Sequence, residues 1–297
     1  MTLEQLRIFI AVAEREHMTA AARELDLTQS AVSAAIAGLE QRYETKLFDR
    51  IGRGIALTEA GRVFLGEARA VLARAASAEI ALADLAGLKR GALSLAASQT
   101  VANYWLPQLI ARFCVAYPGV DVKMAIDNTA EVARMAGDGA IDLGYVEGRV
   151  ADPALIVERV AEDELILVAP PGHAWLAKPP RRREEFASAR WVLREPGSGT
   201  RAAVETALAT VGLALGDIDV ALTFPSNEAV RAAVEADAGV AVMSRLVALR
   251  ALKSGLIAEV DSTLPKRAFS SLRHKDRFVS NAMSAFMAFV AQAPLQA

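Results

Sequence analysis

The chain has 297 residues, of which 53% are hydrophobic and 23% charged, and its formal net charge is −2 at pH 7. This length predicts about two or three core-forming units. No stretch has the roughly 20 uninterrupted apolar residues of a membrane span, and the chain starts directly with an amphipathic helical pattern, so we expect neither a membrane anchor nor a signal peptide. The single cysteine, Cys114, excludes an intramolecular disulfide and a cysteine-based zinc site, which is typical of a cytoplasmic protein.

Two short helical patterns near the N-terminus meet at a tight break at residues 25–28, and a preceding amphipathic helix packs on both. The first helical pattern begins after Thr19. Thr28 is a suitable N-cap for the second, because its hydroxyl can accept a bond from a free backbone amide. The second pattern has a buried stripe and an opposite polar face: Val32, Ile36 and Leu39 inside, and Gln29, Ser30, Ser33 and Ala34 outside. This arrangement predicts a helix-turn-helix whose second helix reads the major groove of DNA.

A short hairpin is predicted at residues 50–57, where glycines stand at 52 and 54, and it would form a wing. Net charge does not reveal a nucleic-acid binder, because residues 1–58 hold seven basic and eight acidic side chains. Placement is more informative, since basic residues follow the second helix where a wing meets phosphates. The expected DNA contacts are Thr28, Gln29, Ser30 and Ser33 on the helix, and Arg23, Arg50 and Arg53 at phosphates.

The segment 18–62 resembles the winged helix-turn-helix of LysR-type transcriptional regulators. The resemblance is carried by Ala21-Ala22, Gln29-Ser30-Ala31-Val32-Ser33, Leu39-Glu40, Leu47-Phe48-Asp49-Arg50 and Leu57-Thr58-Glu59-Ala60-Gly61. It implies promoter DNA as a partner, with RNA polymerase as a further one. The chain departs from many relatives after Ser33, where Ala34, Ala35, Ala37 and Gly38 replace longer polar side chains and leave fewer groups to contact bases.

A long helix is predicted from Thr58, its N-cap, to about residue 87. Its apolar positions alternate by four and three, a heptad seam made of Phe64, Ala68, Val71, Ala75, Ala78, Leu82 and Leu85. About 30 helical residues span about 45 Å, more than local structure can cover. We expect the seam to pair with the same helix of a second copy, mainly through Phe64, Val71, Leu82 and Leu85. Packing on the rest of its own chain is the alternative.

Beyond the linker, short apolar strands alternate with helices, which predicts an α/β domain with mostly parallel sheets. The layout resembles the two-lobed, periplasmic-binding-protein-like effector domain of the same family, whose two crossover strands connect the lobes. We therefore expect an α/β multidomain chain. Its parts are a winged helix-turn-helix (1–58), a dimerisation helix (59–87), a hinge (88–91) and an effector-binding domain (92–297), with lobe I at 92–162 and 268–297 and lobe II at 163–267.

Two junctions between a strand and a helix are candidates for a ligand site, because ligands of open α/β sheets bind where strands end and helix N-termini begin. Glycines allow the backbone to come close to a ligand, and hydroxyls add hydrogen-bond donors. The candidates are Ser98, Gln99 and Thr100 at the first junction, and Arg194, Gly197, Ser198, Gly199, Thr200 and Arg201 at the second. Asn128 and Glu147, which follow two other strands, would also face the cleft. Together these groups suit a small oxyanion; two ordinary capped turns are the alternative.

The segments 98–104, 142–148 and 194–201 resemble more specifically the branch that regulates sulfite and sulfate assimilation and carbon-fixation genes. This implies a sulfur oxyanion or a small phosphorylated or carboxylated metabolite as effector, with sulfite first. By position, Ser98, Thr100 and Thr200 match the hydroxyls that hold an anion in sulfur-responsive relatives. Glu147 would repel a dianion unless Arg194 or Arg201 compensates. It could instead favour a protonated ligand such as bisulfite, or receive an amine.

An enzyme is disfavoured, because the only histidines are at positions 17, 173 and 274, and neither His17 nor His173 has an evident nucleophile or ligand partner. Neither a phosphate-binding loop nor a dinucleotide fingerprint is present, so no cofactor and no metal is expected. Gly197-Ser198-Gly199 lacks the spacing of a nucleophile elbow. A hydrolase using Ser198 and a ligand-blind architectural DNA-binding protein remain as alternatives. The leading interpretation is a ligand-responsive regulator that binds an interrupted palindrome as a homodimer or a dimer of dimers.

The two classes of DNA contact should separate by mutation. Gln29→Ala should weaken binding to the specific site by about 1–3 kcal/mol and leave non-specific binding unchanged, because it removes a base contact. Arg53→Ala should weaken binding to all sequences and reduce the salt dependence, because it removes a phosphate contact. Fluorescence anisotropy with specific and random duplexes at several salt concentrations measures both effects. Identical behaviour of the two variants would contradict this division.

Overall fold

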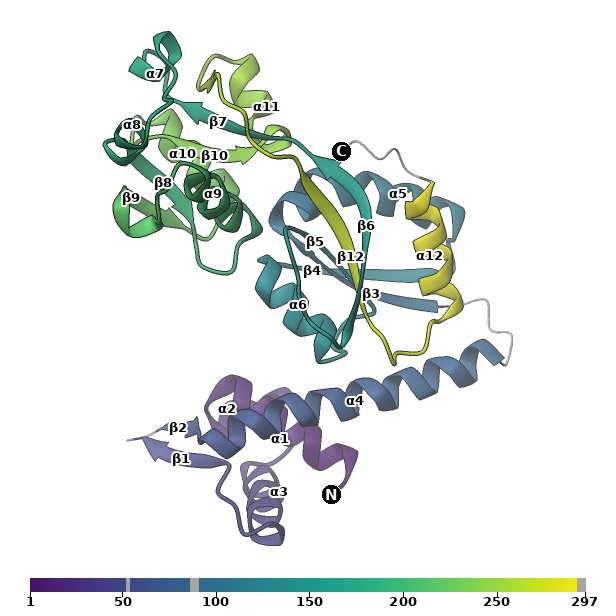
Figure 1. Cartoon of the computed structure of the whole chain (residues 1–297). Helices are drawn as coiled ribbons and strands as arrows, with labels where there is room; N and C mark the ends of the chain where they lie inside the picture. The colour runs from purple at the N-terminus through teal and green to yellow at the C-terminus, as the bar shows by residue number, and fades with distance from the viewer. Residues whose placement is uncertain (52–53, 86–90, 293–297) are drawn as a thin grey trace. The chain divides into compact units, whose positions relative to one another are not determined.

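The computed structural model describes residues 1–51, 54–85 and 91–292, and describes only the backbone at 77, 80 and 83–85. The chain forms two compact units that divide near residue 88 (Figure 1). Within the described residues, no helix is long and apolar enough to cross a membrane.

The N-terminal unit is a winged helix-turn-helix followed by a long helix. Its elements are α1 (Leu3–Arg15), α2 (Met18–Glu24), α3 (Gln29–Arg42), β1 (Phe48–Ile51), β2 (Gly54–Leu57) and α4 (Glu59–Leu85). The Thr28 hydroxyl caps α3 by accepting from the amide of Ala31 at 3.2 Å, as predicted. The N-cap of α2 is His17, whose imidazole accepts from the amide of Ala20 at 3.3 Å, so the helix begins at Met18 and not after Thr19 as predicted. Strands β1 and β2 pair antiparallel and form the expected hairpin.

Aromatic rings join the long helix to the helix-turn-helix. The ring of Phe9 in α1 lies 5.4 Å from that of Phe48 in β1 and 4.7 Å from that of Phe64 in α4. Ala21 and Ala22 are fully buried, which lets the helices approach closely. The unit therefore has one continuous core that includes the first turns of α4.

The predicted dimerisation seam of α4 divides into two parts. Phe64 and Ala68 belong to the core of their own unit. Further along, the side chains of Val71 and Leu82 are 42% and 69% exposed, whereas that of Leu85 lies outside the described residues. Only the distal part of the seam therefore remains uncovered by the helix-turn-helix.

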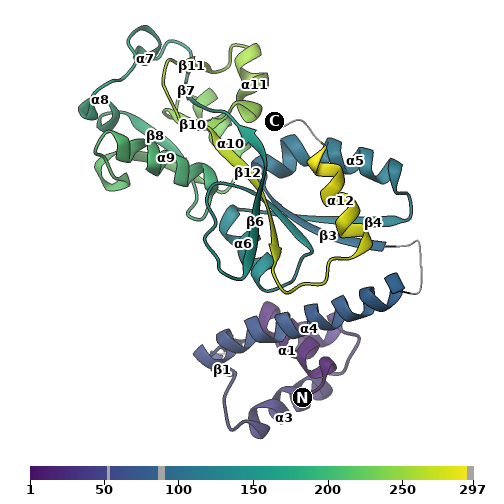
Figure 2. The ribbon, with the colours of Figure 1, turned by 45° about the vertical axis from the view of Figure 1, so that its right-hand side comes forward.

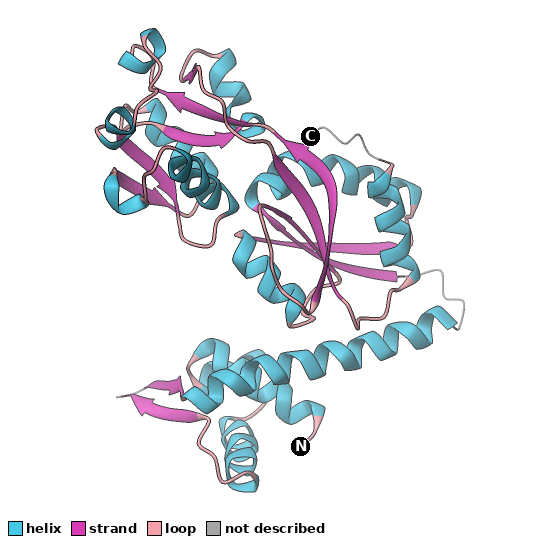
Figure 3. Ribbon diagram, viewed as in Figure 1, coloured by secondary structure: helices cyan, strands magenta, loops and turns pink. Residues whose placement is uncertain are grey.

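The first lobe of the C-terminal unit is a five-stranded sheet in the order β4-β3-β5-β12-β6 with helices on both faces. Its strands are β3 (Gly91–Ser98), β4 (Val120–Asp127), β5 (Leu143–Glu147), β6 (Leu155–Asp163) and β12 (Arg267–His274). Helices α5 (Leu106–Ala116) and α12 (Asn281–Ala291) cover one face, and α6 (Thr129–Gly137) covers the other (Figure 3). A short π-helical turn, η1 (Val101–Trp105), links β3 to α5.

The second lobe holds two small sheets, β10-β7-β11 and β8-β9. Its strands are β7 (Leu165–Ala169), β8 (Arg190–Arg194), β9 (Asp219–Phe224), β10 (Ala241–Ser244) and β11 (Ala258–Val260). Its helices are α9 (Gly199–Thr210), α10 (Asn227–Glu235) and α11 (Arg245–Lys253), with short turns that the sequence pattern did not predict: α7 (Ala174–Ala177), α8 (Arg183–Ala187) and η2 (Leu215–Asp217).

Strands β6 and β12 lie side by side and carry the chain between the lobes (Figures 1 and 2). Their register pairs Arg267, the first residue of β12, with Asp163, the last residue of β6. Strand β12 is antiparallel to both of its neighbours, as are β10 and β11 to β7. The prediction of mostly parallel sheets was therefore wrong, because apolar periodicity identifies a strand but not its direction.

A carboxylate holds the segment between α3 and the wing. Glu40 accepts bonds from the backbone amides of Leu47 at 2.8 Å and Phe48 at 3.3 Å, and pairs with Lys46 at 2.8 Å. Partial burial acts to raise the pKa of Glu40, but the bonds from Lys46 and the two amides outweigh it and hold the pKa below its usual value. Glu40 is therefore more stable as a carboxylate in the folded state than in the unfolded one.

Glu40→Gln should destabilise the N-terminal unit by about 1 kcal/mol at pH 7, because a neutral amide accepts these bonds less strongly. A carboxylate whose folded pKa is depressed stabilises above its unfolded pKa, and this contribution disappears as pH falls through the folded value. The difference between wild type and variant should therefore shrink below about pH 4.5. Urea denaturation at pH 7 and at successively lower pH measures this, with the exposed Glu67→Gln as control. A pH-independent difference would contradict it.

Candidate functional site

The candidate DNA-reading face lies at the start of α3. Gln29 and Ser30 are exposed, Ser33 is half-buried, and the Thr28 hydroxyl caps the helix beside them. Gln29 and Arg50 line the same groove of about 220 Å³, which His17 and Thr19 also line, so the helix start and the wing face one space. Arg23 is exposed on α2, and Arg53 lies outside the described residues.

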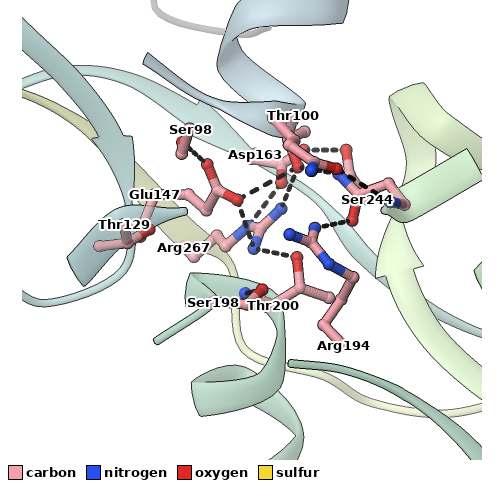
Figure 4. A network of polar contacts seen from close by, with 12 residues as sticks. Ser98, Thr100, Thr129, Glu147, Asp163, Arg194, Ser198, Thr200, Ser244 and Arg267 are labelled. Atoms are coloured by element: carbon pink, nitrogen blue, oxygen red, sulfur yellow. Dashed lines mark hydrogen bonds and ion pairs between the residues drawn. The ribbon is translucent and has the colours of Figure 1, made fainter. Parts of the chain in front are cut away.

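In the C-terminal unit, the hydroxyls of the first predicted junction surround a carboxylate of the protein itself. Ser98, at the end of β3, donates to one oxygen of Glu147, and Thr100 donates to the other at 3.3 Å (Figure 4). Thr129 donates to the backbone carbonyl of Glu147 at 2.9 Å. The Glu147 side chain is fully buried, so its carboxylate depends on these donors.

A guanidinium that the sequence analysis did not identify completes this cluster. Arg267 lies 3.9 Å from Glu147 and donates from Nε to Asp163 at 2.6 Å. It also donates to the hydroxyls of Thr200 at 3.0 Å and Thr100 at 3.3 Å, one from each junction. Ser244 donates to the second oxygen of Asp163 at 2.6 Å. One buried cation thus connects both predicted junctions (Figure 4).

The two arginines expected to balance Glu147 are engaged elsewhere. Arg194 forms a two-point bond with its neighbour Glu195, at 2.7 and 2.8 Å, and a third bond with Asn227. Arg201 pairs with Glu205 at 3.2 Å and donates to the Arg194 carbonyl. The possible compensation of Glu147 by Arg194 or Arg201 is not realised in the structure: these arginines pair with Glu195 and Glu205, and Arg267 is the cation beside Glu147.

Glycines of the second junction let the two lobes touch. A Cβ on Gly199 would lie 2.2 Å from the carbonyl oxygen of Glu147, so no side chain fits there. Gly197 has φ near +89° and faces Asn128, whose side chain caps α6 by accepting from Glu131 at 3.1 Å. Asn128 therefore faces the second lobe but does not join the Glu147 cluster. Ser198 is the N-cap of α9 and accepts from the amides of Thr200 and Arg201.

A second set of contacts joins the lobes through α10. Gln99 accepts from the amide of Asn227 at 3.0 Å and donates to the Pro225 carbonyl, and the Asn227 side chain donates to Thr100 at 3.1 Å. Tyr104 donates to Glu228 at 2.9 Å. Partial burial and the bond with Glu228 raise the pKa of Tyr104 to about 12, which keeps this hydroxyl a donor. The helix starting at Asn227 thus belongs to the site, although the sequence reasoning did not include it.

A cavity of about 520 Å³ opens beside the cluster, between the lobes. Glu147, Ser198 and Gly199 form its inner wall, and Arg149 and Arg201 line it with the acidic Asp152 and Glu205. Glu147 lines this cavity, whereas the groups that donate to it, Ser98 and Thr100, and the Arg267 guanidinium do not. The cavity offers no histidine or cysteine for nucleophilic chemistry among the described residues that line it.

Comparison with known proteins agrees with this architecture. Residues 3–62 match the family described as bacterial regulatory helix-turn-helix protein, lysR family, and residues 86–294 match the LysR substrate binding domain. The chain is 35% identical to the uncharacterized HTH-type transcriptional regulator YeiE of Escherichia coli K12, over 97% of this chain and 96% of that protein. It is 33% identical to a probable RuBisCO transcriptional regulator of Cyanidioschyzon merolae, over 96% of each chain. The crystal structure of CbnR, a LysR family transcriptional regulator, superposes with a TM-score of 0.68, 23% identity and 98% coverage of both chains.

Gly199→Ala should force the lobes apart, since its Cβ would meet the Glu147 carbonyl at 2.2 Å and the Thr129 hydroxyl at 2.9 Å. We expect a loss of about 1–3 kcal/mol in the stability of the C-terminal unit, as for an overpacked core. Hydrogen exchange should also accelerate at residues 147–150. Gly216→Ala is the matched control, because a Cβ there meets nothing within 4 Å. Equal behaviour of the two variants would show that the close approach is unimportant.

Proposed function

The chain belongs to the LysR family of DNA-binding transcriptional regulators, and from that premise we propose that its C-terminal unit senses a small oxyanion of the sulfite type. The observation that supports this is the convergence of donors on the Glu147 carboxylate: hydroxyls from Ser98 and Thr100 and the Arg267 guanidinium. A carboxylate is itself an oxyanion. The residues around it therefore have the chemistry that a bound sulfite would require.

Binding would have to accommodate the charge of Glu147. An entering anion can replace the carboxylate at the hydroxyls, in which case Glu147 moves toward the adjoining cavity that it already lines. A ligand that carries a proton, such as bisulfite, can instead donate a hydrogen bond to the carboxylate. Both routes change the partners of Arg267, and through it the contacts between the lobes.

The same proposal assigns roles to the N-terminal unit. Gln29, Ser30 and Ser33 would read bases, and Arg23, Arg50 and Arg53 would hold phosphates.

The exposed side chains of Val71 and Leu82 on α4 would pair with a second copy, so that a dimer, or a dimer of dimers, binds an interrupted palindrome in the cytoplasm. RNA polymerase would be a further partner. Ligand binding would change the relative orientation of the paired heads.

A phosphorylated acid is the second candidate effector. Sulfite needs only a small part of the cavity of about 520 Å³, and Arg149 and Arg201 in its lining suit a second anionic group. One of the relatives is named a probable RuBisCO transcriptional regulator, which supports a metabolite of carbon fixation. A ligand with two anionic groups would place one of them near Ser98 and Thr100 and the other near Arg149 and Arg201.

Two alternatives have less support. The Ser198 hydroxyl is buried and accepts from two backbone amides as the N-cap of α9, and none of the described residues that line the adjoining cavity is a histidine. Members of this family are regulators rather than enzymes. A ligand-blind architectural role would leave the buried donors around Glu147 without a purpose beyond stability. DNA footprints that stay unchanged across a panel of metabolites would favour that role.

Calorimetric titration of the full chain with sulfite, sulfate, thiosulfate, O-acetylserine and 3-phosphoglycerate tests the proposal. We expect saturable heat with sulfite. Thr100→Val should weaken sulfite binding by about tenfold or more, because it removes a hydrogen bond to a charged ligand. Glu147→Gln should strengthen it, because the competing charge is gone.

Thr206→Val on the exposed face of α9 is the control for the loss of a hydroxyl, and it should bind sulfite as the wild type does. Absence of heat with every ligand would rule out the sensing proposal. Heat with 3-phosphoglycerate alone, lost in Arg149→Gln, would favour the phosphorylated acid over sulfite.

A further inference from the structure

Lobe II contains a second cavity that the proposed anion site does not use. Its volume is about 230 Å³, and it lies between one face of the lobe II sheets, helix α9 and the irregular segment 262–265. The walls are mainly apolar and include Leu167, Trp191, Val204, Leu208, Val242 and Leu264. None of these residues lines the cavity beside Glu147. We call this space the lobe II pocket.

The size and lining of the lobe II pocket define the kind of molecule that fits. Pockets for drug-sized ligands span roughly 300–1,000 Å³, so this one suits a single ring or a short chain. Apolar cavities of about 150 Å³ bind molecules as simple as benzene, because water gains little from entering them. The Trp191 indole nitrogen already donates to the Phe186 carbonyl at 3.0 Å, so the indole contributes an apolar surface and no free donor.

Polar groups gather at the mouth of the pocket. Arg181 lines it and pairs with Asp261 at 2.8 Å, and their side chains are 61% and 77% exposed. An exposed ion pair of this kind contributes little stability, so a ligand carboxylate can compete with Asp261 for the guanidinium. The hydroxyls of Ser262 and Thr263 stand in the same lining. The mouth of the pocket therefore suits a ligand that carries one negative charge attached to an apolar group.

We propose that the lobe II pocket binds a small carboxylic acid with an apolar ring. Its carboxylate would lie at Arg181 and its ring against Trp191 and Leu264. The site is separate from the proposed anion site, but the two share one segment of chain. Leu264 in the pocket wall is three residues from Arg267, the cation that connects the lobes. An occupant is therefore placed to restrain the segment that positions this guanidinium.

Titration of the full chain with benzoate, followed by tryptophan fluorescence and by calorimetry, tests the proposal. Because Trp191 lines the pocket, we expect a saturable fluorescence change. Ala207 also lines it, from α9, and Ala207→Leu should weaken benzoate binding by about tenfold or more by filling the space. Ala209→Leu is the matched control on the exposed face of the same helix and should bind benzoate normally.

Two further variants keep the outcome clear. Thr263→Phe narrows the exposed mouth and should weaken binding even if Ala207→Leu folds poorly, which thermal unfolding would reveal. Arg181→Gln should weaken benzoate binding several-fold and leave the affinity for benzyl alcohol unchanged. No saturable binding, or equal affinities in Ala207→Leu and Ala209→Leu, would overturn the proposal. If Arg181→Gln weakened the binding of benzoate and of benzyl alcohol by the same factor, the proposed contact between the ligand carboxylate and Arg181 would be refuted. Sulfite titrations of the same variants report separately on the anion site.

Discussion

The guanidinium of Arg267 is the group on which the interlobe structure depends. Its side chain is 7% exposed, so its charge is compensated by buried partners and not by water. Its three nitrogens point to different partners: Nε to Asp163, Nη1 to Thr200 and Nη2 to Thr100. Only arginine presents donors in such a planar fork, and a lysine ammonium could not replace it. Removing one partner of such a buried pair typically costs about 3–5 kcal/mol, because the other charge stays buried.

The position of Arg267 in the chain explains how a ligand at Glu147 could affect the whole unit. Arg267 and Asp163 are paired across β12 and β6, where both strands leave the first sheet. Its other partners, Thr100 and Thr200, begin helical segments in different lobes. A change at the Glu147 carboxylate therefore alters bonds in both lobes and at the crossover simultaneously. A ligand can shift the populations of lobe arrangements only if it binds them differently, and this shared cation is a physical source of such a difference.

Features that depend on local chemistry could be predicted from the sequence. The caps at Thr28 and Thr58 follow from a hydroxyl placed before a helical pattern, and both accept backbone bonds in the structure. The hydroxyls at 98 and 100 were expected at a strand end, where they indeed lie. The role of Arg267 could not be predicted in this way, since Asp163 and Thr100 are 104 and 167 residues away in sequence. Arg194 was considered as a possible partner of Glu147, and nothing in the sequence pattern showed that its own neighbour, Glu195, would pair with it.

The charges in the cluster restrict which anions the proposed effector site would accept. Glu147 and Asp163 bring two carboxylates against the one guanidinium of Arg267, while Arg194 and Glu195 balance each other. The buried group therefore carries one negative charge in excess when both carboxylates are ionised. Adding a dianion to it without other change would bury two more negative charges, which the low dielectric of the interior makes very unfavourable. An anion that displaces Glu147 into the open cavity avoids most of this cost, and one that brings its own proton avoids part of it. Sulfite can use both routes near neutral pH, whereas sulfate, which is fully ionised there, can use only the first.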